Sequence, residues 1–154
     1  MFYRGRCYTQ DRVSIGPFDP ALPQFASVAS DVREPARHWV SESAGREDIL
    51  YFSIFLGKEL SGQILLHDMN TQTWESLVAF HLFSTQIRGQ GIGTQAIRLL
   101  QSYVMSQTVL RKLVIITSRD NLASQRIAQK CGFQYVGSSR EDPVNEMVFE
   151  WLVP

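Results

Sequence analysis

The sequence predicts an α/β fold of the α+β type, in which a mixed sheet of six to seven strands is combined with about four helices. Three β-rich runs between residues 49 and 83 are separated by a short turn and a polar loop, which is typical of an antiparallel meander. A helical period and a compact apolar run follow, so residues 74–116 read as strand, helix and strand, a parallel βαβ unit. Two further strand-like runs close the chain.

The composition favours a single domain over residues 1–154. Of the 154 residues 44% are hydrophobic and 19% are charged, which is enough apolar material for one core. Fifteen basic residues balance fifteen acidic ones, so we expect no nucleic-acid partner. No run approaches about 20 apolar residues, so we expect no membrane span and no membrane partner. No apolar run follows the charged residues at the start of the chain, so we expect no signal peptide and a cytoplasmic protein. Cys7 and Cys131 share no ligand spacing with the histidines, so we expect reduced thiols and no metal.

The first half is the less regular one. Residues 13–18 read as a short strand closed by Gly-Pro, and from Asp19 to Ser43 the pattern is helical but weak. Its candidate core residues are Ala26, Ala29, Trp39 and Val40, and we expect it to be broken into pieces by Pro20, Pro23 and Pro35. Strands are then predicted at residues 49–56, 60–67 and 74–83, and the last is apolar nearly throughout, which favours a central position.

The second half has clearer signals. A helix is predicted from Thr94 to about Gln107, because apolar residues recur at helical spacing: Ala96, Ile97, Leu100, Tyr103 and Val104. Residues 112–117 read as a buried strand. Asn121 is a good N-cap for a helix that Gly132 ends. Residues 133–137 and 146–152 are the closing strands.

The segment that carries chemistry is Gln-Ile-Arg-Gly-Gln-Gly-Ile-Gly-Thr at residues 86–94, where three glycines alternate just before a helix. Glycine lets a ligand approach peptide N–H groups closely. The first N–H groups of a helix lack an intrahelical partner, and the helix dipole favours negative charge there. A pyrophosphate is the natural occupant, and Arg88 can add charge-assisted hydrogen bonds.

Two other interpretations of this loop stay open at this point. Such glycines also occur in tight loops that bind nothing. Residues 91–96 formally fit the GxGxxG/A pattern of dinucleotide-binding folds, and Asp120 follows the next strand. Against that interpretation, the preceding strand ends several residues too early and an antiparallel meander comes before it. A Walker A loop is excluded, because no Gly-Lys-Ser/Thr is present.

A third interpretation rests on a resemblance. Arg-Gly-Gln-Gly-Ile-Gly at residues 88–93 is similar to the Arg/Gln-x-x-Gly-x-Gly/Ala signature of the GNAT acyltransferases. Asn121-Leu-Ala-Ser124, with Gly132-Phe133 at the helix end, resembles the family's second motif. The order of elements agrees from about Leu60 onward. Asn-x-x-Ser without a later tyrosine looks most like the branch that includes the ribosomal-protein alanine N-acetyltransferases.

The resemblance implies the GNAT fold, in which two central parallel strands, here residues 74–83 and 112–117, splay apart. The unpaired backbone of the splay would accept the pantetheine arm of acetyl-CoA as a pseudo-strand. The N–H of Leu82 would polarise the thioester oxygen, and Asn121 would hydrogen-bond pantetheine. The resemblance assigns the binding of acetyl-CoA to Leu82, Phe83, Ile87, Arg88, Gly89, Gln90, Gly91, Ile92, Gly93, Thr94, Asn121 and Ser124.

Transfer also requires a proton for the departing thiolate. Many members place a tyrosine seven positions after the helix asparagine, where this sequence has Ala128. Ser124 is the expected substitute, with Tyr135 and Tyr103 as weaker alternatives. A helix serine that faces solvent or bonds to its own backbone is the competing explanation for Ser124.

For the base we predict Glu75, which stands 13 residues before Arg88, an offset found in some histone acetyltransferases of the family. Glu141, between the last two strands, is the second candidate. Either glutamate is equally well explained as a surface residue. His81 could relay a proton through water, but on an apolar strand it reads rather as a core histidine. Positioning without any base is the remaining option.

The expected function is therefore an N-acetyltransferase that moves an acetyl group from acetyl-CoA to a primary amine, by direct attack in a ternary complex. The acceptor is a protein N-terminus, another peptide or a small-molecule amine, and a homodimer is compatible with the sequence. The acceptor wall would come from the last hairpin and from the N-terminal helices, in which Arg33, Arg37, His38 and Trp39 cluster. A solvated helix face with one core tryptophan explains these four residues somewhat better. The alternatives are a catalytically silent acyl-CoA sensor and, more remotely, a dinucleotide-binding oxidoreductase.

Overall fold

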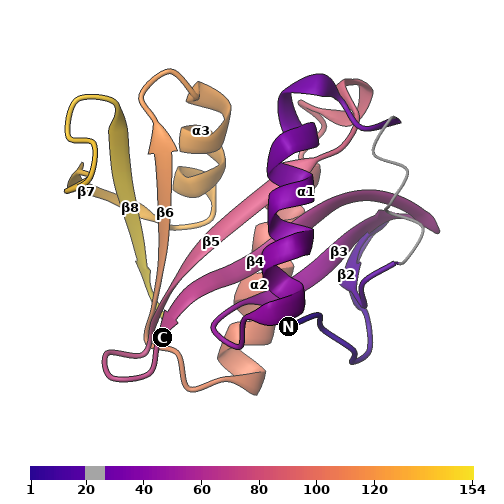
Figure 1. The fold of residues 1–154 in the computed structure, drawn as a ribbon, viewed down its shortest axis with the longest axis horizontal. Helices are drawn as coiled ribbons and strands as arrows, with labels where there is room; N and C mark the ends of the chain where they lie inside the picture. The colour runs from indigo at the N-terminus through magenta and orange to yellow at the C-terminus, as the bar shows by residue number, and fades with distance from the viewer. Residues whose placement is uncertain (20–26) are drawn as a thin grey trace.

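A computed structural model describes residues 1–19 and 27–154 (Figure 1). The elements in chain order are β1 (Tyr8–Gln10), β2 (Val13–Gly16), α1 (Ser30–Gly45), β3 (Leu50–Leu56), β4 (Glu59–Asn70), β5 (Glu75–Leu82), the one-turn 3₁₀ helix η2 (Thr85–Ile87), α2 (Ile92–Gln107), β6 (Lys112–Ser118), α3 (Leu122–Lys130), β7 (Gln134–Ser138) and β8 (Glu146–Leu152). In the described part of the chain, one mixed sheet has the strand order β1-β2-β3-β4-β5-β6-β8-β7.

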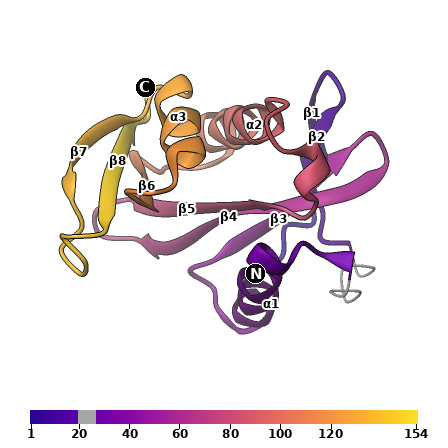
Figure 2. The ribbon, with the colours of Figure 1, turned by 90° about the horizontal axis from the view of Figure 1, so that it is seen from above.

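The sheet separates two layers of helix. Figure 2 shows α1 on one face and α2 with α3 on the other. The larger core lies under α2, whose predicted apolar stripe is buried: Ala96, Ile97, Leu100 and Val104 are all fully inaccessible. A smaller core, with Tyr51 and Leu65 at its centre, lies between the sheet and α1. None of the described helices is long and apolar enough to span a membrane.

The predicted meander is confirmed as β3, β4 and β5, which pair antiparallel in sequence order. β4 is longer than predicted, because it continues beyond His67 to Asn70 through an irregularity at which Asp68 has a φ of 49°. The register places Gln63 opposite His81. Directly opposite residues share a face of the sheet, so both side chains lie on the face that carries α1, as does the neighbouring Leu65.

The splay implied by the family resemblance is confirmed. β5 and β6 run parallel and pair only at Glu75–Lys112, Ser76–Leu113 and Leu77–Val114. β6 pairs instead with β8 along its whole length. Beyond Leu77 the two parallel strands diverge, as Figure 1 shows, and residues 78–82 of β5 keep a strand neighbour only on the β4 side.

Two expectations that concern the N-terminal half need correction. Pro35 does not break the helix, since α1 runs through it; at the sixth helical position Pro35 removes a single backbone donor, while packing at the fully buried Ala36 holds the helix. The sheet has eight strands, one more than the upper prediction, because the three-residue β1 forms a hairpin with β2. The described residues contain three α-helices and η2, in agreement with the prediction of about four helices. The predictions for Pro20, Pro23 and Ala26 lie outside the described residues.

Candidate active site

Two cavities meet where β5 and β6 diverge. The larger, of about 1150 Å³, lies between α1, the splayed strands and the β7–β8 hairpin, and the smaller, of about 500 Å³, lies at the N-terminus of α2. Four residues line both of them: Phe80, His81, Asn121 and Ser124. The splay thus connects the two cavities, and side chains from β5 and α3 form the junction between them.

The smaller cavity is built to receive an anion. Gly91 caps α2 without a side-chain hydrogen bond, and the first intrahelical bond runs from Gln95 to Gly91, so the N–H groups of residues 92–94 have no helical partner. The helix dipole adds partial positive charge at these groups. Arg126 and Lys130 of α3 line the same cavity. The predicted phosphate site therefore has both the donors and the charge that it needs.

The three glycines of the loop have two different structural roles. Gly89 and Gly91 have φ angles of 75° and 79°, and a Cβ at either would meet nothing within 4 Å, because both line the smaller cavity. At those two positions glycine supplies the left-handed backbone and leaves space for a ligand. Gly93 is buried instead, and a Cβ there would lie 3.0 Å from Ile127 and 3.5 Å from Phe80. It allows α2 to pack closely on α3 and β5.

The side chain of Arg88 forms an ion pair with a residue of α1. Its guanidinium forms a two-point ion pair with Asp31, with distances of 2.7 Å and 3.0 Å, and reaches the carbonyl oxygen of Leu82 at 3.4 Å. The hydrogen bond from Arg88 lowers the pKa of Asp31, and Asp31 raises the pKa of Arg88. The ion pair joins the glycine loop to α1 across the mouth of the smaller cavity, so a phosphate at α2 would rely on backbone donors.

The backbone of β5 offers hydrogen-bonding groups to the splay. Phe83 donates its N–H to Ser61 of β4 (2.9 Å). Because bonding direction alternates along an antiparallel strand, the backbone groups of Leu82 and Phe80 point away from β4, toward the side from which β6 has departed. The N–H of Leu82, predicted to face the thioester, therefore faces this opening.

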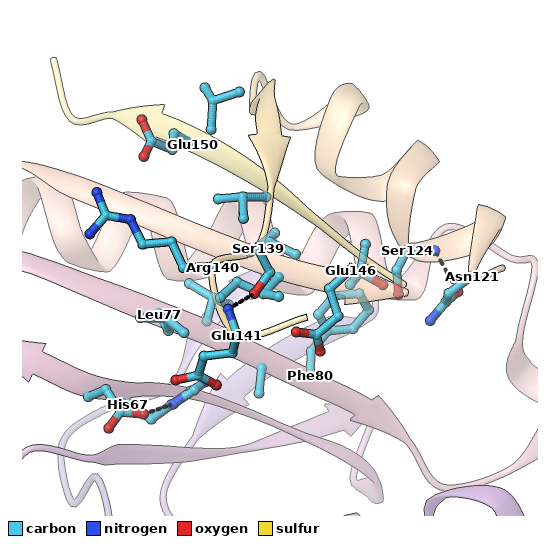
Figure 3. Close-up of a pocket in the computed structure, with 18 of the residues that line it drawn as sticks. His67, Leu77, Phe80, Asn121, Ser124, Ser139, Arg140, Glu141, Glu146 and Glu150 are labelled. Atoms are coloured by element: carbon cyan, nitrogen blue, oxygen red, sulfur yellow. Dashed lines mark hydrogen bonds and ion pairs between the residues drawn. The ribbon is translucent and has the colours of Figure 1, made fainter. Parts of the chain in front are cut away.

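At the start of α3, Asn121 acts as the predicted N-cap: its Oδ1 accepts from the Ser124 N–H at 3.1 Å (Figure 3). The Asn121 Nδ2 and the Ser124 Oγ make no hydrogen bond with any described residue. The Ser124 hydroxyl is thus not bonded back to its own helix, and Ser124 lines both cavities. Ala128, the position of the family's tyrosine, is fully buried in the core.

The larger cavity is acidic. The carboxylates of Glu141 and Glu146 point into it in Figure 3, and neither makes a hydrogen bond or ion pair with the described residues. Its two other carboxylates are engaged: Glu150 with Lys112 at 3.2 Å, and Asp68 with Arg46 and His67. Glu141 was a sequence candidate, whereas Glu146 was missed. As the first residue of β8 it pairs with Ser118, a register that no local pattern reveals.

Glu75, the first choice for the base, is not brought to either cavity. It lies at the paired end of β5 and β6, where its carboxylate forms an ion pair with Lys112 at 2.9 Å. The structure therefore brings Ser124 and Glu141 to one cavity but leaves Glu75 at the other end of the strand. The role predicted for Glu75 stays a prediction from the sequence.

Several other predicted residues also lie off the cavities. Phe83 has both backbone groups engaged, since its carbonyl accepts from Ala29 at 2.8 Å. Ile87 packs against the larger core, and the Gln90 side chain bonds Gln86 and Arg12. The tyrosine alternatives are similarly placed: Tyr103 belongs to an aromatic cluster with Tyr3, Tyr8 and Phe52, and Tyr135 is half exposed on β7. Of the residues expected at the acceptor wall, Trp39 lines the larger cavity and packs against His67 with tilted rings, while Arg33, Arg37 and His38 do not line it.

His81 is more than a core histidine. Its Nδ1 lies 3.1 Å from Gln63 Nε2, and burial, with a smaller effect of Arg88, lowers its pKa to about 4. It belongs to both cavity linings. The described residues contain no group of three or more histidine, cysteine or carboxylate side chains arranged to hold a metal ion.

Comparison with known proteins agrees with this geometry. The model of the acetyltransferase (GNAT) domain matches residues 12–134. None of the curated proteins is similar enough in sequence to count as a match. Among solved structures, an apo form of RimL, the ribosomal L7/L12 alpha-N-protein acetyltransferase, superposes with a TM-score of 0.81 at 17% identity, over 96% of this chain and 94% of that one.

Two further structures are similar. The spermidine N-acetyltransferase from Vibrio cholerae, in complex with CoA and spermine, gives a TM-score of 0.76 at 12% identity, over 92% of this chain and 96% of that one. The microcin C7 self-immunity acetyltransferase MccE, in complex with acetyl-CoA and AMP, gives 0.72 at 16% identity, over 94% of each chain. At these identities the likeness establishes the fold. Since the family model covers most of the sequence, the chain belongs to the acetyltransferase (GNAT) domain family, as its two motifs predicted.

Proposed function

We propose that this protein transfers an acetyl group from acetyl-CoA to a primary amine. One observation carries the proposal: an anion site at an uncapped helix start and an acidic cavity open onto the same break between two parallel strands. A donor held in the smaller cavity and an amine held in the larger would meet beside Phe80, His81, Asn121 and Ser124.

The smaller cavity suits the donor. The amides of residues 88–94 would hold the diphosphate, with Arg126 and Lys130 contributing positive charge. The pantetheine arm would take the backbone groups of β5 that lack a strand partner, among them the Leu82 N–H, and the unused Asn121 amide. The similar structures of MccE and of the spermidine acetyltransferase contain acetyl-CoA and CoA respectively, which supports this assignment.

The larger cavity suits a cationic acceptor. A protonated amine would be drawn to the unpaired carboxylates of Glu141 and Glu146. It must lose a proton before it attacks, and a carboxylate in the cavity can accept that proton, directly or through water. The spermine bound in one similar structure and the ribosomal protein named for another are compatible with this chemistry.

Two residues receive chemical roles in the proposal. Glu141, flanked by Glu146, accepts the proton of the amine. Ser124, whose hydroxyl has no other partner, donates a proton to the thiolate of CoA as the acetyl group leaves. The proposal needs no covalent enzyme intermediate. It assigns the base to Glu141 rather than to Glu75, because Glu75 lines neither cavity.

The test is release of CoA thiol from acetyl-CoA in the presence of single amines: spermidine, a peptide with a free N-terminal alanine and one with a free N-terminal serine. Turnover with at least one amine, and an acetylated product by mass spectrometry, is expected. Binding of acetyl-CoA by calorimetry without turnover on a broad panel of amines would instead identify a silent acyl-CoA sensor. Stabilisation by NAD but not by CoA would contradict the donor assignment.

A further inference from the structure

A chain of three side chains ends at the junction of the two cavities. The Tyr51 hydroxyl donates to Gln63 Oε1 at 2.7 Å, and Gln63 Nε2 lies 3.1 Å from His81 Nδ1. Tyr51 and Gln63 are completely buried. The three residues come from the adjacent strands β3, β4 and β5, and Gln63 and His81 are direct cross-strand partners. The sheet itself therefore holds the imidazole in place.

This chain has a direction. A phenol carries a single proton, and burial raises the pKa of Tyr51, so Tyr51 stays neutral and donates. Gln63 receives that bond on its oxygen and presents its NH₂ group to His81. An amide NH₂ can only donate, so Nδ1 of His81 must be the acceptor. A neutral imidazole that accepts at Nδ1 carries its proton on Nε2.

The Nε2–H remains available to a ligand. It makes no hydrogen bond with any described residue. Among the described residues, only one side-chain N or O atom is both buried and without a hydrogen-bond partner, and that atom is Ser43 Oγ. The His81 Nε2 has no partner either, so it is not a buried atom. The unpartnered Nε2 of His81 must therefore touch the cavity. Because burial lowers the pKa of His81 to about 4, the ring is neutral near pH 7 and too weak a base to deprotonate an ammonium group.

We propose that His81 is a catalytic hydrogen-bond donor, whose Nε2–H stabilises the negative charge that develops on the thioester oxygen, while Gln63 and Tyr51 are positioning residues that hold its tautomer. This inference rests on the proposed function. The Leu82 N–H, one residue along β5, faces the same opening, so two donors are available to one oxygen. Preorganised donors of this kind act where charge appears during the reaction.

The proton inventory of the step is simple. The amine nitrogen forms a bond to the acetyl carbon, and the carbonyl electron pair moves to the oxygen. That pair then re-forms the carbonyl as the carbon–sulfur bond breaks. The ammonium group gives one proton to Glu141 before it attacks, and the nitrogen releases a second proton once it is bonded to the acetyl carbon. Ser124 gives its proton to the thiolate and regains one from the nitrogen, directly or through water, while His81 keeps its own throughout.

Charged and titratable groups face His81 from each element around the cavities, and any pH profile must account for them. They are Arg88 from the glycine loop, Asp31 from α1, His67 and Asp68 from β4, Arg126 and Lys130 from α3, and Arg140, Glu141, Glu146 and Glu150 from the β7–β8 hairpin. Variants of His81 and Gln63 are therefore compared with wild type at each pH, so that the titration of the shared groups cancels.

The first test reads the tautomer and needs no activity. Long-range proton–nitrogen NMR spectra of protein labelled with nitrogen-15 histidine should show His81 protonated on Nε2 and bare on Nδ1 near pH 7, with the signals assigned by their loss in His81→Gln. A proton on Nδ1, or fast exchange between the two tautomers, would overturn the inference.

The second test is kinetic, with acetyl-CoA and the amine that wild type acetylates fastest on the panel. His81→Ala should lower kcat about 100-fold while the Kd of acetyl-CoA stays within about twofold of wild type. In Gln63→Glu the carboxylate accepts from both Tyr51 and His81, so the ring carries its proton on Nδ1 and kcat falls. As the pH is lowered the ring becomes doubly protonated, Nε2–H returns, and the ratio of variant to wild-type kcat should rise. A packing role would give no such recovery.

A milder variant covers the case in which Gln63→Glu does not fold. Tyr51→Phe removes the donor that orients Gln63, so the tautomers should mix and kcat should fall severalfold. If wild type turns over and the kcat of His81→Ala lies within about twofold of the wild-type value, the role of His81 is overturned while the proposed function stands. Absence of wild-type turnover with every amine would overturn the proposed function and this catalytic role with it, whatever the tautomer.

Discussion

Arg88 and Asp31 are joined by a two-point ion pair that links the glycine loop to the first turn of α1, 57 positions earlier in the chain. The contact brings together the element that would hold the donor's diphosphate and the helix that contributes to the wall of the acceptor cavity. The side chains remain 35% and 59% exposed, so the pair lies at the cavity mouth rather than inside the core.

Asp31→Asn should lower the free energy of unfolding by no more than about 1 kcal/mol at pH 7, since exposed ion pairs contribute little. The pKa of Asp31 is depressed in the folded state, so the contribution is complete above the ordinary Asp value of about 3.9 and is lost as the pH falls below it. Urea unfolding of both proteins at neutral and strongly acidic pH measures this. A difference that persists unchanged in acid would contradict the ion-pair explanation.

Gly91→Ala should weaken acetyl-CoA binding about tenfold or more, because its methyl group would stand in the smaller cavity and its φ of 79° is strained for alanine. Gly57→Ala is the matched control: its φ is 60°, nothing lies within 4 Å of a Cβ, and it belongs to the β3–β4 turn outside both cavities. Both variants should lose about 1 kcal/mol of stability. Calorimetric titration should show weaker binding in Gly91→Ala alone; equal affinities would contradict the cradle.

Ser124→Ala should reduce kcat about 100-fold if its hydroxyl protonates the thiolate. The helix cap uses the backbone N–H of Ser124, so the substitution leaves the Asn121 cap intact and the melting temperature close to that of wild type. Ser102→Ala on α2 is the control, since that hydroxyl bonds the carbonyl of Arg98 and lines neither cavity. Unchanged turnover in Ser124→Ala would remove the serine from the proposed mechanism.

Glu141→Gln and Glu146→Gln should each impair use of the amine, raising its KM or lowering kcat about tenfold or more, without changing acetyl-CoA affinity. Glu75→Gln serves as the comparison, because Glu75 is a carboxylate of the same sheet but lines neither cavity. Its kinetic constants should match those of wild type. Its free energy of unfolding should fall slightly, because the ion pair with Lys112 is lost. A large kinetic defect in Glu75→Gln with normal Glu141→Gln and Glu146→Gln would restore the base predicted from the sequence.

His81 should make the protein less stable in mild acid. Its folded pKa of about 4 lies below the unfolded value of about 6.5, so between these values only the unfolded chain binds the proton. Stability should therefore fall as the pH is lowered through this window, and His81→Gln should flatten the decline. Burial also lowers the pKa of His67, so part of the slope remains in the variant. Parallel curves of unfolding free energy against pH would contradict the prediction.

Patterns within single elements predicted much of the fold. The helical stripe of α2, the N-cap at Asn121 and the left-handed Gly132 follow from contiguous residues, and the structure places all of them as expected. β1 was missed because its three residues, a half-buried Tyr8 followed by the exposed Thr9 and Gln10, are too few to show a strand period. The prediction that Pro35 breaks the helix was wrong, because the loss of one backbone N–H costs less than the packing of the whole of α1 contributes.

By itself the sequence determined the glycine turn and the helix start that follows it, because both depend on the backbone conformation of neighbouring residues. Tertiary structure decided which side chains surround the larger cavity: Glu146 lines it, Glu75 is paired with Lys112 away from it, and His81 is bonded through Gln63 to Tyr51. These relationships cross strands that are distant in the chain. They depend on register and on where β5 parts from β6, and packing of the complete sheet sets both.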